Sequence, residues 1–223
     1  MHFRNSLLVR PSAPHGALSE VSDAKQLHAK EWPANERVAA TLLLRDAYGN
    51  LTSGGEALTA RVVDGGGGVD EAVAVPYTRG VMPRDGLVVH DGGDGSYELR
   101  CVPKGIGLAS LELRLADGSA LRGTPLSLTV VPGRAAARCC HAVGDGVRGV
   151  AAGCPAELRV VACDASGNRL RRGGLALRAL LAPRQPGQEV SVRDAGDGSY
   201  VVTYVVPYSG KHTLAVSCPP PTS

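Results

Sequence analysis

The large side chains that usually fill a protein core are scarce in this sequence. It has one Phe, one Trp and two Met among 223 residues, against 29 Gly and 15 Pro. Gly and Pro interrupt regular elements and favour turns, so this composition predicts many short strands joined by turns. The length allows either one large domain or two domains of roughly 110 residues each.

Charge of one sign and long apolar runs are also lacking. The 24 basic and 21 acidic residues are interspersed and leave a formal net charge of +3. No basic field is therefore available to attract a nucleic acid. The longest apolar runs, such as TLLL at 41–44, are far shorter than the roughly 20 residues of a membrane-spanning helix. We expect neither nucleic-acid binding nor membrane insertion.

Motifs of catalysis and of cofactor binding are missing as well. Histidines such as His90, His141 and His212 are scattered, without a nucleophile elbow, paired acids or a His-Glu-x-x-His sequence. The stretch GDGVRG at 144–149 matches the dinucleotide-binding motif G-x-G-x-x-G in residue spacing, but no β-α-β pattern surrounds it. We predict no enzyme active site and no cofactor in this chain.

Two parts of the sequence repeat one order of motifs. RDAYGNLTSGG at 45–55 returns as CDASGNRLRRGG at 163–174, and DGGDGSYELRCVPKGIG at 91–107 returns as DAGDGSYVVTYVVPYSG at 194–210. A fixed order of motifs reveals the repeating structural unit. Calcium loops need six or more oxygen ligands. We therefore interpret the Asp-Gly-Asp-Gly stretches as turns, in which Gly takes a positive φ and Asp bonds to its own backbone.

Alternation of apolar and polar residues predicts strands in both copies. Every second residue of these strands is expected to face a core. These residues are Tyr97, Leu99, Cys101, Leu111, Leu113 and Leu115 in the first copy, and Tyr200, Val202, Tyr204, Leu214 and Val216 in the second. Short strands at regular spacing, with Gly, Asn and Asp turns, are typical of β-sandwiches. The sequence thus predicts an all-β fold of two tandem antiparallel β-sandwiches.

In their order these motifs resemble the immunoglobulin-like repeats of filamin. The first copy matches the filamin pattern at Asp46, Gly49, Asn50, Gly54, Gly55, Asp91, Asp94, Gly95, Tyr97, Pro103, Gly107 and Thr124-Pro125-Leu126. The second matches it at Asp164, Gly167, Asn168, Gly173, Gly174, Asp194, Asp197, Gly198, Tyr200, Pro207 and Gly210. The resemblance covers nearly the whole chain. It implies two tandem immunoglobulin-like, filamin-type sandwiches from a longer array.

Departures from the filamin pattern set the expected domain boundaries. Residues 1–11 resemble the last strand of a preceding repeat, and 12–132 form a repeat with an inserted loop or hairpin near 64–85. Residues 133–223 form a repeat that lacks its final strand, because consecutive prolines in PPPTS supply no amide donors. We expect this sandwich to be the weaker one. The strand could be supplied by a partner, by sequence beyond Ser223, or by SLLVR at 6–10 of a neighbouring molecule or, less easily, of the same chain.

Six cysteines invite a disulfide or zinc interpretation. Cys101 and Cys218 occupy inward positions and are expected to be small core residues. Cys139, Cys140, Cys154 and Cys163 fit no standard zinc spacing, so we predict no metal site. We expect mostly reduced thiols, with one or more disulfides as the alternative. Reduced thiols place the protein in the cytoplasm.

The resemblance implies a non-enzymatic scaffold or protein-interaction module in a larger cytoskeleton-associated repeat protein, with a ciliary location as one variant. Filamin-type repeats pack in arrays, and some bind extended peptides by strand addition beside the strand after Gly-Gly. The candidate edge comprises Leu175, Ala176, Arg178 and Leu180, of which the last three are expected to face outward. The actin-binding head of filamins is not present, so actin binding is not supported.

Two other functions stay open. An extracellular cell-adhesion module would be supported by disulfides and by a glycan at Asn50, within the sequon Asn50-Leu51-Thr52. The repeats could also be the substrate-recognition part of a larger multidomain enzyme.

Overall fold

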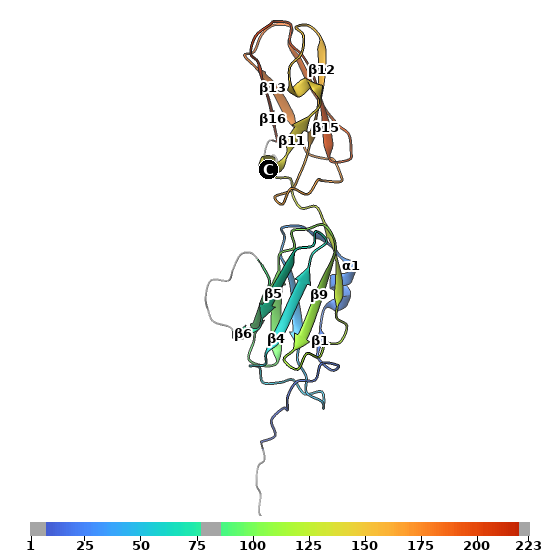
Figure 1. Cartoon of the computed structure of the whole chain (residues 1–223), viewed down its shortest axis with the longest axis vertical. Coiled ribbons are helices and arrows are strands. Elements are labelled where there is room, and N and C mark those ends of the chain that lie inside the picture. The colour runs from blue at the N-terminus through green and yellow to red at the C-terminus, as the bar shows by residue number, and fades with distance from the viewer. Residues whose placement is uncertain (1–7, 77–85, 219–223) are drawn as a thin grey trace, which may run out of the picture. The chain divides into compact units, whose positions relative to one another are not determined.

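Strands dominate the computed structural model, which describes residues 8–76 and 86–218. Its helical elements are short: α1 (Ala24–Ala29) and the 3-10 turns η1 (Ala137–Cys139) and η2 (Asp145–Val147). The chain divides into two units, Met1–Val131 and Pro132–Ser223, and each is a β-sandwich (Figure 1). The prediction of an all-β, immunoglobulin-like fold is confirmed.

The first unit has two five-stranded sheets. One has the order β1-β3-β8-β7-β6 and the other β2-β10-β9-β4-β5. Their bounds are β1 (Glu20–Val21), β2 (Glu31–Pro33), β3 (Val38–Leu43), β4 (Leu58–Val63), β5 (Val69–Val73), β6 (Val75–Pro76), β7 (Val88–Asp91), β8 (Ser96–Cys101), β9 (Gly107–Leu115) and β10 (Leu126–Val131). Strand neighbours are antiparallel except β2 with β10 and β6 with β7, which are parallel.

The core of the first unit follows the alternation read from the sequence. The six positions expected to face inward, on β8 and β9, are all buried. They pack with alternate residues of β3, β4 and β10 into one apolar cluster, as expected for two sheets facing each other. The predicted inward parity is therefore confirmed for the first copy.

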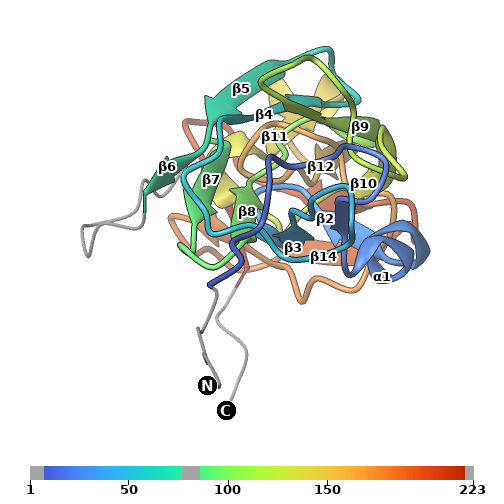
Figure 2. The same ribbon diagram turned by 90° about the horizontal axis from the view of Figure 1, so that it is seen from below.

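The inserted segment of the first unit runs along one side of the sandwich. Strand β5 pairs antiparallel with β4 at the edge of one sheet, and β6 pairs with β7 at the edge of the other (Figures 1 and 2). Residues 77–85 of the expected insert lie outside the described residues. The described part thus supplies an outer strand to each of the two sheets.

The second unit has fewer strands. A four-stranded sheet has the order β11-β12-β15-β14, and a two-stranded sheet pairs β13 with β16, all antiparallel. The bounds are β11 (His141–Val143), β12 (Pro155–Val161), β13 (Arg178–Ala182), β14 (Glu189–Asp194), β15 (Ser199–Val205) and β16 (Thr213–Ser217).

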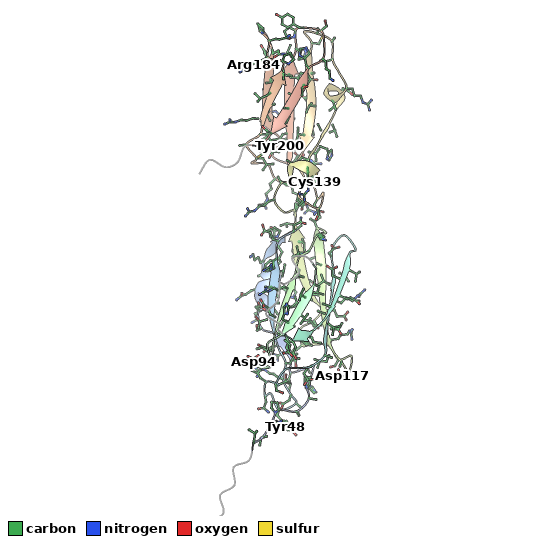
Figure 3. The ribbon with its side chains drawn as sticks, turned by 90° about the vertical axis from the view of Figure 1, so that its left-hand side faces the viewer. Tyr48, Asp94, Asp117, Cys139, Arg184 and Tyr200 are labelled. Atoms are coloured by element: carbon green, nitrogen blue, oxygen red, sulfur yellow. The ribbon has the colours of Figure 1, made fainter. Side chains whose placement is uncertain are left out.

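The inward positions of β15 are buried as predicted, namely Tyr200, Val202 and Tyr204 (Figure 3 labels Tyr200). The expectation that Cys218 is a core residue is wrong, because its side chain is exposed. Its counterpart Leu115 lies on the long strand β9, whereas the pairing of β16 with β13 ends at Ser217 opposite Arg178. Cys218 therefore lies beyond the last paired residue.

The Asp-x-x-Gly-Asn turns are held by a buried aspartate in each unit. Asp46 Oδ1 accepts hydrogen bonds from the backbone N–H groups of Tyr48 and Asn50, both at 2.9 Å. Burial alone would raise the pKa of Asp46, but hydrogen bonds from Asn50, Ser12 and Tyr48 outweigh it and lower the pKa to about 2. Asp164 is held in the same way, and its pKa is also lowered.

The Asp-Gly-Asp-Gly stretches are turns, which confirms the sequence interpretation. Gly95 and Gly198 have φ values of 83° and 79°, a region that side chains other than Gly rarely adopt. A Cβ on Gly95 would lie 2.5 Å from the carbonyl oxygen of Thr52, and one on Gly198 would lie 2.0 Å from that of Leu170. These glycines allow the turn to lie directly against the preceding loop in each unit.

Candidate functional site on the second unit

The strand pair β13–β16 of the second unit corresponds to β4–β9 of the first. The register of the two pairs agrees. Ala60 lies opposite Leu113 and Ala179 opposite Val216, and two residues further along each strand Val62 lies opposite Leu111 and Leu181 opposite Leu214. In the first unit, β5 and β10 flank this pair on its two sides. In the second unit, neither β13 nor β16 has a further strand neighbour within residues 132–218. The two outer edges of β13–β16 are the candidate sites.

Motif residues fix the position of β13. The Tyr200 hydroxyl accepts a hydrogen bond from Leu175 N at 2.9 Å, and Asp194 Oδ2 accepts one from Gly174 N at 2.6 Å. In the first unit, Tyr97 and Asp91 make the same bonds to the segment before β4. The repeated Gly-Gly, Asp and Tyr therefore hold the start of this strand against the turn before β8 or β15.

The edge of β13 carries the residues selected from the sequence. Arg178 and Leu180 lie on its outward face, and the Leu180 side chain is 62% exposed. Ala176, just before the strand, is also exposed. Leu175 is half-buried and packs against the core, so its side chain does not share the outward face. Three of the four predicted residues thus lie together on one exposed surface.

The matching position of the first unit shows how this edge is normally covered. Arg61 takes the place of Leu180 and faces Glu71 of β5, with Arg61 Nε 3.0 Å from Glu71 Oε1. In the second unit a leucine stands there, on a strand with no described outer neighbour. An exposed apolar residue on an open strand edge favours pairing with another chain.

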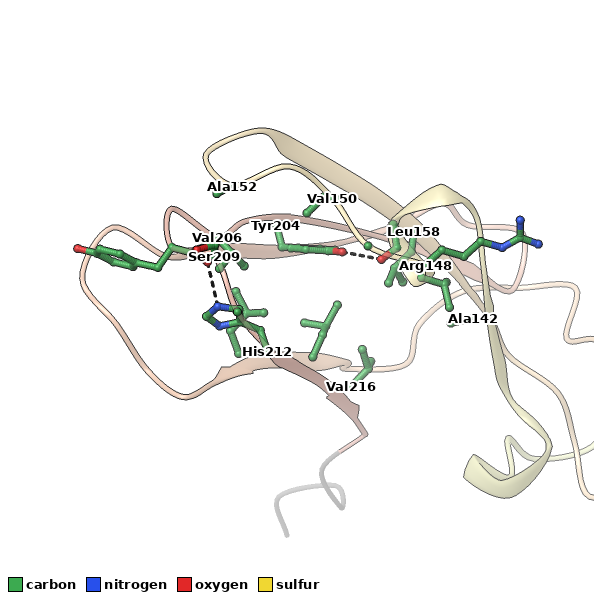
Figure 4. A pocket seen from close by; sticks show the side chains of 17 residues that line it. Ala142, Arg148, Val150, Ala152, Leu158, Tyr204, Val206, Ser209, His212 and Val216 are labelled. Carbon is green, nitrogen blue, oxygen red and sulfur yellow. Dashed lines mark hydrogen bonds between the residues drawn. The ribbon is translucent and has the colours of Figure 1, made fainter.

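A groove of 510 Å³ opens between the two sheets beside β16. It is lined by apolar side chains from β12, β13, β15 and β16, by the segment around η2, and by residues 206–212, and its polar lining residues include Arg148, Ser209 and His212 (Figure 4). Tyr204 lies along the groove and donates a hydrogen bond from its hydroxyl to the Gly146 carbonyl at 2.5 Å. Sequence reasoning expected an open core here but missed the η2 segment as a wall.

Side chains beneath this groove are less buried than their counterparts in the first unit. Leu214 and Val216 are half-buried, whereas Leu111 and Leu113 at the same register positions are 1% and 0% exposed. The difference lies in β10, which covers β9 but has no counterpart on β16 within the described residues. The groove therefore exposes part of the core of the second unit.

The glycines of GDGVRG have a packing role in this wall. A Cβ on Gly146 would lie 2.5 Å from the carbonyl oxygen of Glu157 on β12. Gly144 and Gly149 have φ values of 110° and 131°, which favour Gly. Gly146 therefore lets the backbone approach β12 closely.

The cysteines divide into buried and exposed side chains. Burial, with a smaller contribution from Asp70, raises the pKa of the Cys101 thiol to about 12. Burial also raises the pKa of Cys163. Cys154 and Cys218 are exposed. Over residues 8–76 and 86–218 there is no disulfide, and no group of three or more His, Cys, Asp or Glu side chains is placed to hold a metal ion.

In the same residues, no helix has the length and apolar character needed to cross a bilayer.

Comparison with known proteins finds similar repeats. The family model described as "Filamin/ABP280 repeat" matches residues 134–219. Filamin-C of Rattus norvegicus and of Mus musculus is 30% identical over 130 residues, which are 57% of this chain and 4% of either relative. The adhesin FdeC of Escherichia coli is 22% identical with a TM-score of 0.56, over 94% of this chain and 62% of that structure. This last likeness supports the fold alone.

The match to Filamin-C extends beyond the second unit, because its 130 aligned residues exceed the length of Pro132–Ser223. The chain spans only about 4% of the length of these relatives. Filamin repeats are non-enzymatic protein-interaction modules. Residues 134–219 are therefore similar to the filamin repeat, and the first unit carries the same order of motifs.

Proposed function

We propose that this chain is an interaction module of a larger cytoskeleton-associated repeat protein, and that the second unit binds an extended peptide along β13. The observation that carries the proposal is the difference between two equivalent edges. Strand β5 pairs with β4 throughout its length, whereas β13 has no such neighbour within the described residues. A peptide added to β13 would take the place that β5 occupies in the first unit.

Main-chain hydrogen bonds would supply much of the affinity, and side chains opposite Arg178 and Leu180 would supply specificity. In the first unit the oppositely charged Glu71 faces Arg61 across the two strands. By the same rule, the peptide should carry an apolar residue opposite Leu180. It should carry an acidic residue two positions away, opposite Arg178. The expected ligand is therefore an extended segment with alternating apolar and acidic side chains on one face.

A cytoplasmic, cytoskeletal location is supported by the likeness to Filamin-C. The likeness to FdeC concerns the fold alone and does not favour an adhesive function. The location is tested by imaging the full-length protein and by counting thiols on material isolated without reductant.

Peptide binding is tested by selecting ligands from a random peptide library with the 223-residue chain as bait. Leu180→Glu should lower the affinity for the selected peptides by at least about tenfold, because it puts a charge opposite an apolar residue of the peptide. Leu108→Glu is the matched control: Leu108 on β9 is 72% exposed, and its substitution should leave binding unchanged. Hydrogen exchange should show new protection on β13. Protection on other strands alone, or full binding by Leu180→Glu, would refute the proposed site.

A further inference from the structure

We infer that the outer face of the sheet β11-β12-β15-β14 binds an acidic segment of a partner protein, through Arg159, Arg169 and Arg193. This face belongs to the other sheet of the second unit from the one that contains β13. The inference is therefore independent of peptide binding along β13.

Basic residues are unevenly divided between the two units. Residues 132–218 hold 11 basic and 6 acidic residues, a formal net charge of +5, whereas residues 1–131 hold 13 basic and 15 acidic residues. Ten of the 11 basic residues of the second unit are arginines. The planar guanidinium group of arginine matches a carboxylate with two parallel hydrogen bonds. The second unit is therefore the one that attracts acidic partners.

Two of these arginines lie in one row across the sheet. Arg159 of β12 and Arg193 of β14 are each directly opposite Val201 of β15, and both arginines are exposed. Because neighbouring strands are 4.7–4.9 Å apart, the two Cβ atoms are about 10 Å apart. One ligand chain that crosses the strands can therefore reach both arginines.

The side chain between the two arginines indicates that they are ordered before any ligand binds. Val201 alternates with the inward-facing Tyr200 and Val202 of the core, so it points outward. Even so, Val201 is only 4% exposed. The aliphatic stems of Arg159 and Arg193 account for this burial, since such stems cover apolar surface while the charged group stays in water. Arginines held in this way lose less conformational freedom on binding.

A third arginine adjoins this row through a shared aspartate. Arg169 Nη2 is 2.7 Å from Asp197 Oδ2, and Arg159 Nη1 is 4.0 Å from the same oxygen. Asp197 Oδ1 already accepts hydrogen bonds from Ser199 N at 3.0 Å and Ser199 Oγ at 2.6 Å. Among the described residues Arg193 has no ion pair. One carboxylate thus serves this group of three guanidinium groups, which leaves hydrogen-bond donors for further carboxylates.

The first unit has the same frame without these arginines. Thr41 and His90 stand at the places of Arg159 and Arg193, and they lie opposite Glu98. The frame itself therefore does not need arginines at these places. Their presence in the second unit calls for a role outside the fold.

Carboxylates further along the same face favour a short acidic protein segment over a nucleic acid. Glu157 lies two residues from Arg159 on the outward side of β12, and Glu189 is exposed at the start of β14. Both would repel a phosphate backbone that continued along the strands. A protein segment can carry acidic residues only where it crosses the arginines. In an extended chain, two residues three positions apart span about 10 Å, which matches the row.

Binding of a defined acidic probe is the first test. The probe is a fluorescent peptide of Glu-Glu-Ser repeats, and the control peptide has Gln in place of every Glu. The acidic peptide should bind the 223-residue chain and show increased fluorescence anisotropy, whereas the control peptide should not bind. Its affinity should fall as salt is added, because exposed charges are screened.

Paired substitutions test the location of the site. Arg159→Gln with Arg193→Gln should lower the affinity for the acidic peptide by at least about tenfold, because both charge-assisted contacts are removed. The matched control is Arg184→Gln with Lys211→Gln. Both residues are exposed and lie outside this sheet (Figure 3 labels Arg184), and the net charge changes by the same amount. The control pair should change the affinity less than about threefold, since distant charges are screened. Circular dichroism verifies that both variants are folded.

NMR with the acidic peptide completes the test. The Val201 amide and the guanidinium signals of Arg159 and Arg193 should shift on binding, and these shifts together with the selective loss of affinity support the inference. Shifts confined to β13 overturn it. Equal losses of affinity in the two paired variants also overturn it, and so does an acidic peptide that binds no better than the Gln peptide. None of these results bears on peptide binding at β13, which Leu180→Glu tests separately.

Discussion

The two units share one frame, namely the repeated motifs and the strand pair that they position, and they differ in the strands that flank this pair. In the first unit β5 and β10 flank the pair β4–β9, whereas the equivalent pair β13–β16 is a sheet of two strands within the described residues. The repeated motifs, with their turn aspartates, Gly-Gly and tyrosine, fix the frame in both units. The edges depend on segments that are not repeated. One filamin-type frame can therefore be closed on itself or open to another chain.

The strands at these edges determine how deeply the neighbouring core side chains are buried. Leu111 is 1% exposed under β10, while its counterpart Leu214 is half-buried beside the groove. Fully burying such a side chain contributes about 1.5–3 kcal/mol. The open edge should thus make the second unit the less stable of the two.

The largest expected effect compares the two matched leucines. Leu111→Ala should lower the free energy of unfolding of the first unit by about 2–5 kcal/mol, as for other fully buried leucines. Leu214→Ala should cost about 1 kcal/mol or less in the second unit, because its side chain already contacts solvent. Denaturant unfolding followed by hydrogen exchange separates the two units. Equal costs would mean that the groove is closed in solution.

The motifs made the frame predictable, because each has a local physical role. Alternation identified the buried faces of β8, β9 and β15, and the Asp-Gly-Asp-Gly letters identified the turns before β8 and β15. The partner of β5 could not be read from the sequence, because its residues are mostly exposed and show no clear alternation. Strand pairing with β4 depends on tertiary contacts that the segment's own sequence does not encode.

The site was predictable only in part. The alternation of side chains along the strand placed Arg178 and Leu180 on its outward face. The lack of a closing strand in the second copy indicated an open core. The bond from Tyr204 to Gly146 could not be foreseen, since it joins residues 58 positions apart. Cys218 was misplaced because β16 has five residues where β9 has nine, and strand length depends on neighbouring strands.

Acid should weaken both frames. The pKa of Asp46 is about 2 in the folded chain, against an ordinary value of 3.8. A group whose pKa is lowered by folding stabilises the fold above its unfolded pKa, and this contribution is lost as pH falls through the folded value. Stability of the first unit should therefore fall between about pH 4 and pH 2. In Asp46→Asn this part of the pH dependence should disappear. Thermal unfolding measured across this range tests it, and an unchanged profile would contradict the buried turn.

The smallest expected effect concerns thiol reactivity under native conditions. Cys154 and Cys218 of the second unit should react first with a thiol reagent, because both are exposed. Cys101 of the first unit should react only on unfolding, since burial raises its pKa to about 12 and reagents attack the thiolate. Mass spectrometry of a labelling time course identifies each site. Early labelling of Cys101 would show that the first unit opens more readily than its closed edges imply.

Amide hydrogen exchange measured by NMR tests the difference between the edges most directly. The 223-residue chain is used at a concentration at which sedimentation shows a monomer. Strand β10 pairs with Gly107–Leu111 of β9 and β4 pairs with Ser110–Leu115, so β9 amides that face either of these paired stretches should exchange slowly. On β16 only the alternate amides that face β13 should be slow, and those that face the groove should exchange at least about tenfold faster. Uniformly slow exchange along Thr213–Ser217 in the monomer would contradict an open second unit.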